Sequence, residues 1–371
     1  MTAAGERVTK KTKRAAEEKK SRARSHFRAP RKQFVRRQGW LRQALLRKTK
    51  IEESGRQDPL KYFTLCGAEA LDVLYLASQG VLDFDGRGYP GVVFCEADSD
   101  CLADIISRLG RTLHYFPDRL ENVVLDVQNP FNAEFERLIA FDIFNLDFSG
   151  VCFPRRDAPY SQTLQVLTKI ISLQGVVEAD FDLFVTFRAE RSRENATALQ
   201  ELKRNMKENF GRHTGIRDSF SGRHGDIDRL LKRDYPRFLL ATFPKLILRY
   251  GNDKNYRVAW DDGYMYKSSY RDRNTGHQRW YHIVKFLFTF DFEPASSGIL
   301  QTGPIRSETL AESYVDAVTH AILLEVTDVD CRLRGDAGLK RELKLEVEQL
   351  LHATTPDSAA GSQASDSPNL A

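Results

Sequence analysis

The stretch from Lys61 to Arg188 decides the fold, because it holds five short apolar runs separated by helical patterns. The runs are Lys-Tyr-Phe-Thr-Leu-Cys (61–66), Gly-Val-Val-Phe-Cys-Glu (91–96), Asn-Val-Val-Leu-Asp-Val (122–127), Phe-Asp-Ile-Phe-Asn-Leu-Asp (141–147) and Phe-Asp-Leu-Phe-Val-Thr-Phe (181–187). Such runs are typical of strands buried on both faces of a parallel sheet. Helical patterns lie between them at 68–79, 99–109 and 161–173. This alternation predicts an α/β fold with a doubly wound, mostly parallel sheet.

Polar residues stand at the ends of three of these runs. Glu96 ends the second run, Asp126 lies at the end of the third, and Asn145 and Asp147 lie at the end of the fourth, followed by Phe148. The carboxyl ends of parallel strands border one crevice, where ligands of doubly wound folds bind. We therefore expect a nucleotide-like ligand at this edge of the sheet.

This order of features resembles the class I S-adenosylmethionine-dependent methyltransferases, which are Rossmann-like. The first turn departs from the pattern of that family, because Cys66-Gly67-Ala68-Glu69-Ala70 stands where a glycine-rich loop is usual. The resemblance covers about a third of the chain. It implies a methyltransferase-type sheet with a terminal antiparallel hairpin and added helices.

The resemblance also implies roles for individual residues. Cys66 and Gly67 would border S-adenosylmethionine, Glu96 would bind its ribose hydroxyls, and Asp126 would lie near its adenine. Asn145, Asp147 and Phe148 would form the catalytic group that faces the methyl group and the target base. Carboxylate and amide oxygens can accept hydrogen bonds from an exocyclic amine, and an aromatic ring can stack on a base.

The charge of the chain is unevenly distributed. Residues 1–50 carry 18 Lys+Arg against three Glu, a net of +15, whereas residues 51–371 carry a net of −10. A block this basic is characteristic of an arm that neutralises phosphates. A solvated basic tail without a partner is the alternative.

Within this block we expect residues 1–31 to be a disordered arm and residues 32–58 to form a basic amphipathic helix and a linker. Gly39 weakens that helix. The helix could dock on the body with its arginines outward, enter a nucleic-acid groove or lie on an anionic membrane. The candidate nucleic-acid contacts in it are Arg36, Arg37, Arg42 and Arg47.

The sequence changes character after the fifth run. Residues 188–210 read as a charged helix, residues 211–233 as an exposed polar loop, and residues 238–250 as a strand. Runs at 256–260 and 280–292 flank a segment rich in tyrosine and arginine, which suits the terminal hairpin. Interleaved Tyr266, Arg271 and Arg273 could stack on bases and pair with phosphates. The alternative is that these aromatic rings cover the core.

We expect the methyltransferase-like domain to span residues 59–300, with its core at 61–188 and its hairpin region at 238–292. Two helices should fill residues 301–352, and residues 353–371 should be a disordered tail. The five cysteines form no Cys-x-x-Cys pair, and no metal site is expected. No apolar run approaches the roughly 20 residues that a membrane span needs. We therefore expect a soluble, cytoplasmic protein.

Two functional hypotheses follow. The first is a methyltransferase that uses S-adenosylmethionine to modify a base of RNA or single-stranded DNA. The second is a module of the same fold that has lost catalysis and binds nucleic acid or a protein partner. No Gly-x-Ser-x-Gly motif and no Gly-x-x-x-x-Gly-Lys-Ser/Thr loop occurs, so hydrolase and ATPase classes are disfavoured.

Overall fold

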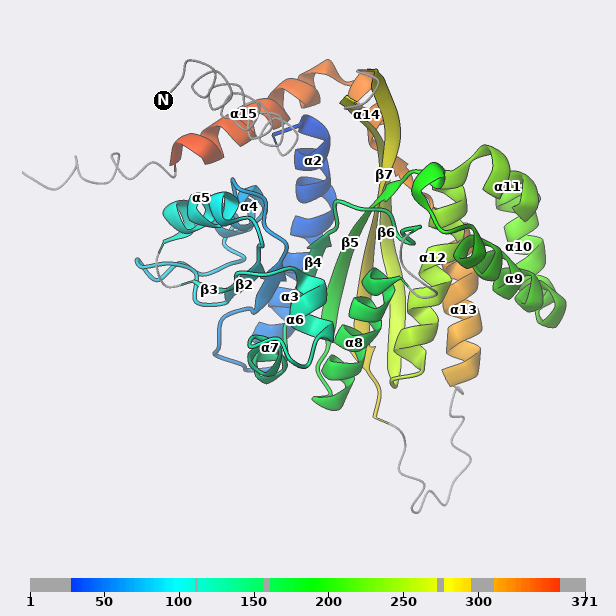
Figure 1. The fold of residues 1–371 in the computed structure, drawn as a ribbon, viewed down its shortest axis with the longest axis horizontal. Helices are drawn as coiled ribbons and strands as arrows, with labels where there is room; N and C mark the ends of the chain where they lie inside the picture. Colours follow the sequence, from blue (N-terminus) through cyan, green and yellow to red (C-terminus); the bar gives the residue numbers. More distant parts are fainter. Residues whose placement is uncertain (1–27, 111–112, 156–160, 272–276, 295–309, 354–371) are drawn as a thin grey trace, which may run out of the picture.

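The structure is a computed structural model that describes residues 28–110, 113–155, 161–271, 277–294 and 310–353. Within these residues, eight strands form one sheet in the order β3-β2-β1-β4-β5-β7-β6-β8 (Figure 1). The strands are β1 (Tyr62–Thr64), β2 (Val92–Cys95), β3 (His114–Phe116), β4 (Ile143–Asp147), β5 (Phe181–Ala189), β6 (Tyr256–Arg271), β7 (Gln278–Phe292) and β8 (Thr327–Asp328).

The sheet is mostly parallel. Strands β3, β2, β1, β4 and β5 pair in parallel, while β7 pairs antiparallel with both β5 and β6. The short strand β8 adds a parallel pairing beyond β6. The expected doubly wound α/β sheet with a terminal antiparallel hairpin is therefore confirmed.

Helices cover both faces of this sheet (Figure 1). One face carries α6 (Leu120–Leu125), α7 (Asn132–Leu138), α8 (Gln162–Val176), α12 (Tyr235–Asn252) and α13 (Leu310–Leu323). The other carries α4 (Leu71–Ser78), α5 (Ser99–Leu109), α14 (Val329–Gly335), α15 (Ala337–Ala353) and an N-terminal helix. Each face buries its own apolar core, as a sheet covered on both sides requires.

The N-terminal helix is part of the core and does not lie on the surface. It runs through α2 (Pro30–Val35), a π-helical turn η1 (Arg36–Trp40) and α3 (Leu41–Glu53). Val35, Trp40 and Ala44 are fully or almost fully buried against the sheet. A side chain at Gly39 would meet Tyr264, because a Cβ atom there would lie 2.8 Å from Cε2 of that ring. The glycine that weakens the helix therefore permits its close approach to the sheet.

The predicted third strand at 122–127 is wrong. Residues 122–125 belong to α6, whose buried Leu120, Val123 and Val124 have the i, i+3, i+4 spacing of a helix. The true third strand is His114–Phe116, and Tyr115 in its middle is exposed. An edge strand of three residues carries too little apolar sequence to stand out.

The predicted strand at 238–250 is also wrong, because these residues form the centre of α12. Asp234 accepts a hydrogen bond from the backbone N–H of Arg237, and Pro236 occupies the first turn, so both helix-start signals are present. Helix α12 contacts the sheet, α8, α9, α11 and α13. A helix enclosed on all sides is apolar all round, and its sequence then resembles a buried strand.

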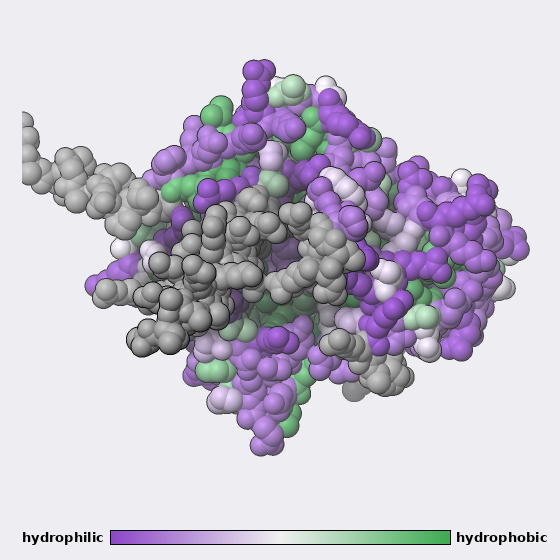
Figure 2. Space-filling view, turned by 45° about the horizontal axis from the view of Figure 1, so that its top comes forward, coloured by the Kyte–Doolittle hydropathy of each residue, from purple (hydrophilic) through white to green (hydrophobic). Residues whose placement is uncertain are grey.

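Residues 211–233 are helical, contrary to the expected loop. They complete a lobe of helices α9 (Ala196–Arg212), α10 (Thr214–His224) and α11 (Ile227–Arg233), which follows the short 3-10 turn η2 (Arg191–Arg193). Ile216, Phe220, Ile227 and Leu230 are the buried anchors of the lobe. In Figure 2 the surface over this lobe, at the right of the view, is predominantly hydrophilic.

The two expected C-terminal helices are present as α13 and α15, with β8 and α14 between them. Helix α15 packs on α2 and α4, so the end of the described chain covers its beginning. Within the described residues, no helix is both long enough and apolar enough to cross a membrane.

Candidate functional site

The strand order β2-β1-β4 brings the polar strand ends together. Thr64, the last residue of β1, pairs with Phe94 of β2 and with Asn145 of β4, and the N–H of Leu65 donates to the carbonyl of Asn145 at 3.0 Å. Strand ends at the same level form one crevice. Cys66, Gly67, Glu96 and Asn145 therefore come from adjacent strand ends, as the resemblance implies.

Asn145 is at the centre of a buried hydrogen-bond network. Its Nδ2 donates to the hydroxyl of Tyr62 at 2.8 Å and to Oδ2 of Asp72 at 2.9 Å. Asp72, from α4, also accepts from the hydroxyl of Thr64 at 2.8 Å. The Oδ1 atom of Asn145 is buried and has no hydrogen-bond partner within the described part of the chain. A buried acceptor without a partner is costly, and a ligand N–H could satisfy it.

Asp147 is held between two lysines. Nζ of Lys32, from α2, donates to its Oδ2 at 2.7 Å, and Nζ of Lys285, from β7, lies 3.8 Å from its Oδ1. Lys285 is 1% exposed, donates to the hydroxyl of Thr186 at 2.9 Å and lies 4.6 Å from the ring centre of Trp40. Burial lowers the pKa of Lys285 to about 7, although Asp147 opposes that change.

Arg36 adds a third cation to this region. It is 2% exposed, and its pKa is lowered by burial, while Asp72 and Asp147 act in the opposite direction. Three cationic side chains thus face two carboxylates under the N-terminal helix. When Lys285 is charged, the cations outnumber the carboxylates by one, which suits an anionic ligand group. Without such a ligand, burial and the nearby cations Lys32 and Arg36 favour the neutral form of Lys285.

Glu96 and Cys66 border the same crevice from the side of β2. The Glu96 carboxylate accepts from the backbone N–H of Asp98 at 2.7 Å, and burial raises its pKa. The Cys66 thiol is buried, and its pKa is raised first by burial and then by Asp72 and Glu96. Cys66 is therefore protonated and lines the site without acting as a nucleophile.

The turn after β1 is closed by a charge pair. Glu69 is buried, and its carboxylate accepts from Nε of Arg28 at 2.8 Å. Ala70 has φ of 46°, a left-handed conformation that leads directly into α4. Gly67 is the single glycine of this turn. Ala70, three residues later, adopts a left-handed conformation that a glycine would adopt without strain.

Phe148 has a different role from the one expected. Its ring stacks on Phe187 at 5.7 Å with planes 3° apart, and the residue is 8% exposed in the core that faces α12. A ring packed in this way is not an open face for a base. Successive side chains along a strand point to opposite faces of the sheet. Phe148 therefore points into the core under α12, away from its neighbour Asp147, and the expected stacking role of Phe148 is wrong.

Asp126 also leaves the predicted site. It ends α6 and accepts from the backbone N–H of Gln128 at 2.9 Å. The carboxylate that follows the true third strand is Asp118, which accepts from Asn122 at 2.9 Å and from Asn129 at 2.7 Å. The signal for it was the Phe-Pro-Asp sequence after a short aromatic run.

Three of the five candidate nucleic-acid side chains that the structure describes are buried. Arg36, Arg47 and Tyr266 are each at most 3% exposed, because the N-terminal helix packs on the sheet with these side chains inward. Arg47 pairs with Asp182 at 2.8 Å, and Arg37 pairs with Glu342 at 2.6 Å. Arg42 is 59% exposed. Arg273 lies outside the described residues, as does the side chain of Arg271.

The sequence pattern indicated the polar strand ends at Glu96 and Asn145 but not the charged side chains that lie beside them. Lys285 carried a signal, because it is the one lysine within the apolar run from Ile283 to Phe290. Lys32 carried none, since it lies within a block of other basic residues. Asp72 was hidden in an ordinary amphipathic helix.

Comparisons with known proteins complete the description of the chain. No curated protein matches it. A solved structure reported for the conversion of a disulfide bond into a thioacetal group during echinomycin biosynthesis is similar at 11% identity and a TM-score of 0.27, over 67% of this chain and 82% of that one. A likeness at this level carries no functional argument. The model of one protein family, described as PP_RS20740-like, matches residues 25–83 and 108–359, well over half of the chain. The chain belongs to the PP_RS20740-like family.

Proposed function

We propose that this protein is an S-adenosylmethionine-dependent methyltransferase that acts on a base of RNA or single-stranded DNA. The observation that carries the proposal is the convergence of Glu96, Cys66, Gly67 and Asn145 at the adjacent ends of β2, β1 and β4. A carboxylate at the end of the second strand suits the recognition of ribose hydroxyls.

The donor set of the crevice fits a methyl donor with an amino-acid part. The buried Oδ1 of Asn145 offers an acceptor for an ammonium group, and the excess of cations at Lys32, Arg36 and Lys285 suits a carboxylate. When bound, S-adenosylmethionine would supply an activated methyl group on a sulfonium. The protein would hold that group in line with the acceptor and exclude water, which is most of what methyl transfer requires.

The nucleic-acid part of the proposal is supported by charge. The net of +15 in residues 1–50 is unlike the rest of the chain and suits a polyanion. A small-molecule substrate would leave this charge without a purpose. Extrahelical or single-stranded bases are the accessible form, since a base within a duplex is stacked and must be flipped out.

Calorimetric titration of S-adenosylmethionine into the wild type and into Glu96→Gln tests the first step. Loss of a charge-assisted acceptor should weaken binding at least tenfold, which corresponds to about 1.5–3 kcal/mol. Asp118→Asn is a matched control, because its carboxylate is occupied by Asn122 and Asn129. Equal affinities for wild type and Glu96→Gln would remove Glu96 from the site.

A second candidate function is favoured by one observation. Asn145 and Asp147, the residues expected to hold the acceptor amine, are engaged by the chain's own Asp72, Lys32 and Lys285. A module that binds nucleic acid or a protein partner without catalysis would retain this arrangement permanently. Radiolabelled methyl transfer to total RNA and denatured DNA separates the two, because the inactive module would bind its partners and label nothing.

A further inference from the structure

We propose that Trp280, Lys267 and His282 on the hairpin, together with Lys232 and Arg233 at the end of α11, form a binding surface for single-stranded nucleic acid. The inference deepens the proposed function and rests on its nucleic-acid part. Tyr266, the expected stacking residue of this hairpin, is buried, whereas Trp280 and Lys267 of the same hairpin face solvent. The nucleotides held there would flank the target base.

Trp280 is the aromatic centre of this surface. It is 62% exposed, whereas Trp40 and Trp260, the other two tryptophans of the chain, are each 2% exposed. A pocket of about 500 Å³ is lined by Trp280, Tyr281, His282 and Lys267. An exposed indole beside a pocket is a platform on which a base can stack, whatever its sequence.

The pocket has cationic walls that the fold holds in place. Lys267 of β6 is exposed and pairs across the hairpin with His282 of β7. Cζ of Arg188, from β5, lies 4.3 Å from the ring centre of Tyr281, and this cation–π contact holds the tyrosine ring in place. Burial and then Lys267 lower the pKa of His282, while Asp234, Asp328 and Asp330 act in the opposite direction. This favours the neutral imidazole, which can accept as well as donate a hydrogen bond.

The end of α11 adjoins this pocket. His282 pairs with Ala189, the last residue of β5, and Arg191 shortly after it donates from Nη1 to the carbonyl of Lys232 at 3.4 Å. Asp234, which follows Arg233, also acts on the pKa of His282. Lys232 and Arg233 therefore lie at the same edge of the sheet as the pocket. A strand stacked on Trp280 could place its phosphates on them.

Charge distribution separates this surface from the rest of the body. Residues 191–237 carry 12 Lys+Arg and seven Asp+Glu, a net of +5, whereas the remainder of the chain after residue 50 has a net of −15. Lys232, Arg233 and Lys267 are exposed, and within the part of the chain that the structure describes no ion pair is formed by the side chain of any of the three. Asp330 accepts a hydrogen bond from the backbone N–H of Lys267 at 2.6 Å, but the ammonium group of Lys267 forms no ion pair with it. Cations whose charged groups are not held by a carboxylate bind phosphate at little cost.

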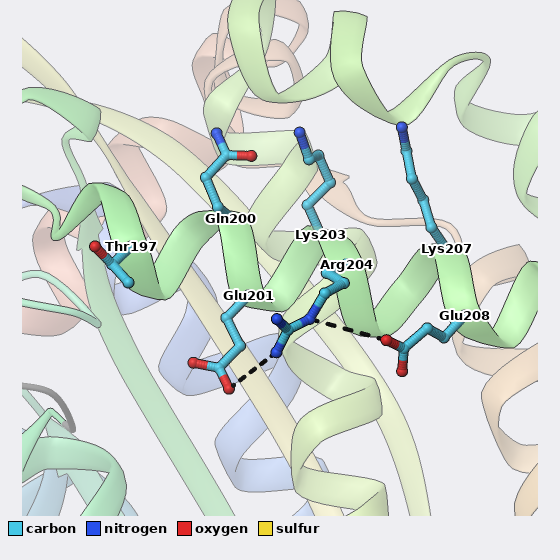
Figure 3. Close-up of a pocket in the computed structure, with 7 residues that line it drawn as sticks. All are labelled: Thr197, Gln200, Glu201, Lys203, Arg204, Lys207 and Glu208. Carbon is cyan, nitrogen blue, oxygen red and sulfur yellow. Dashed lines mark ion pairs between the residues drawn. The ribbon is translucent and has the colours of Figure 1, made fainter.

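A second pocket, on α9, differs from the Trp280 pocket in that its charged side chains are paired with one another or with Asp228 (Figure 3). Arg204 there lies between Glu201 and Glu208, at 3.7 Å and 3.8 Å, and Lys203 and Lys207 both pair with Asp228. Thr197 and Gln200 complete the lining, and no aromatic side chain is present in it. Its charges are compensated within the lobe, so Arg204 provides a control for charge substitutions near, but outside, the proposed surface.

The test is a titration of the full-length protein with a 12-nucleotide oligothymidine and a 12-nucleotide oligouridine, followed by tryptophan fluorescence in the absence of any methyl donor. A base that stacks on Trp280 should quench the tryptophan fluorescence of the wild type. The change can be assigned to Trp280, because Trp40 and Trp260 are buried and out of reach of the oligonucleotide. Trp280→Ala should bind at least fivefold more weakly, as expected from the loss of one stacked base. The double substitution Lys232→Glu, Arg233→Glu should lower the salt dependence of log K by about one, and Arg204→Glu should leave affinity and slope close to wild type.

Three outcomes would overturn the proposal. The first is an unquenched wild type, and the second is Trp280→Ala with the affinity of wild type. The third is tighter binding of a duplex of the same length or of polyglutamate, which would assign the surface to a stacked duplex or to an acidic protein. Calorimetry with S-adenosylmethionine on the same variants keeps the two proposals apart. Quenching without donor binding would reject the methyltransferase and retain the surface.

Discussion

Lys32 and Asp147 are 115 residues apart in sequence, yet Nζ of the lysine donates to Oδ2 of the aspartate at 2.7 Å in a site where both are largely buried. The lysine comes from the first helix, and the aspartate ends the fourth strand. The ammonium group of Lys32 thus hydrogen-bonds to the carboxylate that is expected to orient the amine of a methyl acceptor. This pair connects the packing of the N-terminal helix to the proposed chemistry.

The first prediction concerns this carboxylate and its neighbour Asn145. If they orient the acceptor, Asn145→Ala and Asp147→Asn should each lower single-turnover methyl transfer by ~10²-fold or more, because alignment of the reacting groups can be worth several kcal/mol. Affinity for S-adenosylmethionine should change little. Ser149→Ala serves as a control from the same turn. Variants that are unfolded by circular dichroism, or that retain full activity, would count against these roles.

The second prediction concerns the buried pair of Arg47 and Asp182. Arg47→Ala leaves Asp182, which is completely buried, without its cation, and removing one partner of a buried pair costs about 3–5 kcal/mol. The free energy of unfolding from urea denaturation measures this loss. Lys50→Ala removes a half-exposed cation from the same helix and should cost less than about 1 kcal/mol. A similar, small effect for both would show that the helix is not anchored by Arg47.

The third prediction concerns Gly39 in the π-helical turn. Gly39→Ala should destabilise the protein by about 1–3 kcal/mol, since its Cβ atom would meet the Tyr264 ring and a methyl group of Leu287 at 3.1 Å. Helix propensity alone predicts the opposite sign, because alanine is favoured over glycine by about 1 kcal/mol. Thermal unfolding therefore decides between packing and propensity. Gly211→Ala in α9 is the control, because a Cβ atom there would meet nothing within 4 Å.

The fourth prediction is a pH dependence from Glu194. Burial raises the pKa of this carboxyl from 4.5 to about 7, while Tyr235 and the N–H of Phe153 hydrogen-bond to it. The folded state therefore binds a proton more tightly than the unfolded state. The stability contribution is complete below pH 4.5, falls as the pH rises towards 7, and is lost above 7.

The size of this effect is on the order of 3 kcal/mol, since each unit of pKa difference corresponds to about 1.4 kcal/mol. Glu194→Gln should flatten the decline in the free energy of unfolding between pH 4.5 and 7. Glu201→Gln, on the exposed face of α9, should leave that decline unchanged. An identical pH profile for wild type and Glu194→Gln would contradict the raised pKa.

The fifth prediction concerns the basic arm. Residues 1–27 carry nine Lys+Arg, and their removal leaves the core helix at Pro30–Glu53 in place. If six of these nine contact phosphates, affinity for duplex DNA should fall by ~10³ between 50 and 200 mM salt, and deleting the arm should abolish most of that slope. Deleting residues 1–50 should instead unfold the protein, because Val35, Trp40 and Ala44 would leave the core. A full slope in the shorter deletion would show that the arm does not bind.

The errors of the sequence-based prediction have a common physical origin. A continuous apolar run indicates that a segment is buried but not whether it is a strand or a helix. Residues 122–127 and 238–250 therefore read as strands, although 122–125 and 238–250 are helical. The strand His114–Phe116 escaped because one face of an edge strand is exposed. Arg36 and Arg47 were expected at the surface because they are charged. Both are buried, because carboxylates distant in sequence lie close to their guanidinium groups.

The sequence by itself determined the α/β class, the strands at residues 62–64, 92–95, 143–147 and 181–189, and the terminal hairpin. It also indicated the polar strand ends at Glu96 and Asn145, because the alternation of apolar runs and polar strand ends is a local pattern. Only the tertiary structure decided which charges meet at these strand ends. Lys32, Asp72, Asp147 and Lys285 come from four separate elements, and their pairing depends on strand order and on the docking of the first helix. Long-range contacts of this kind leave no periodicity in the chain, since a buried charge selects its partner by position in space.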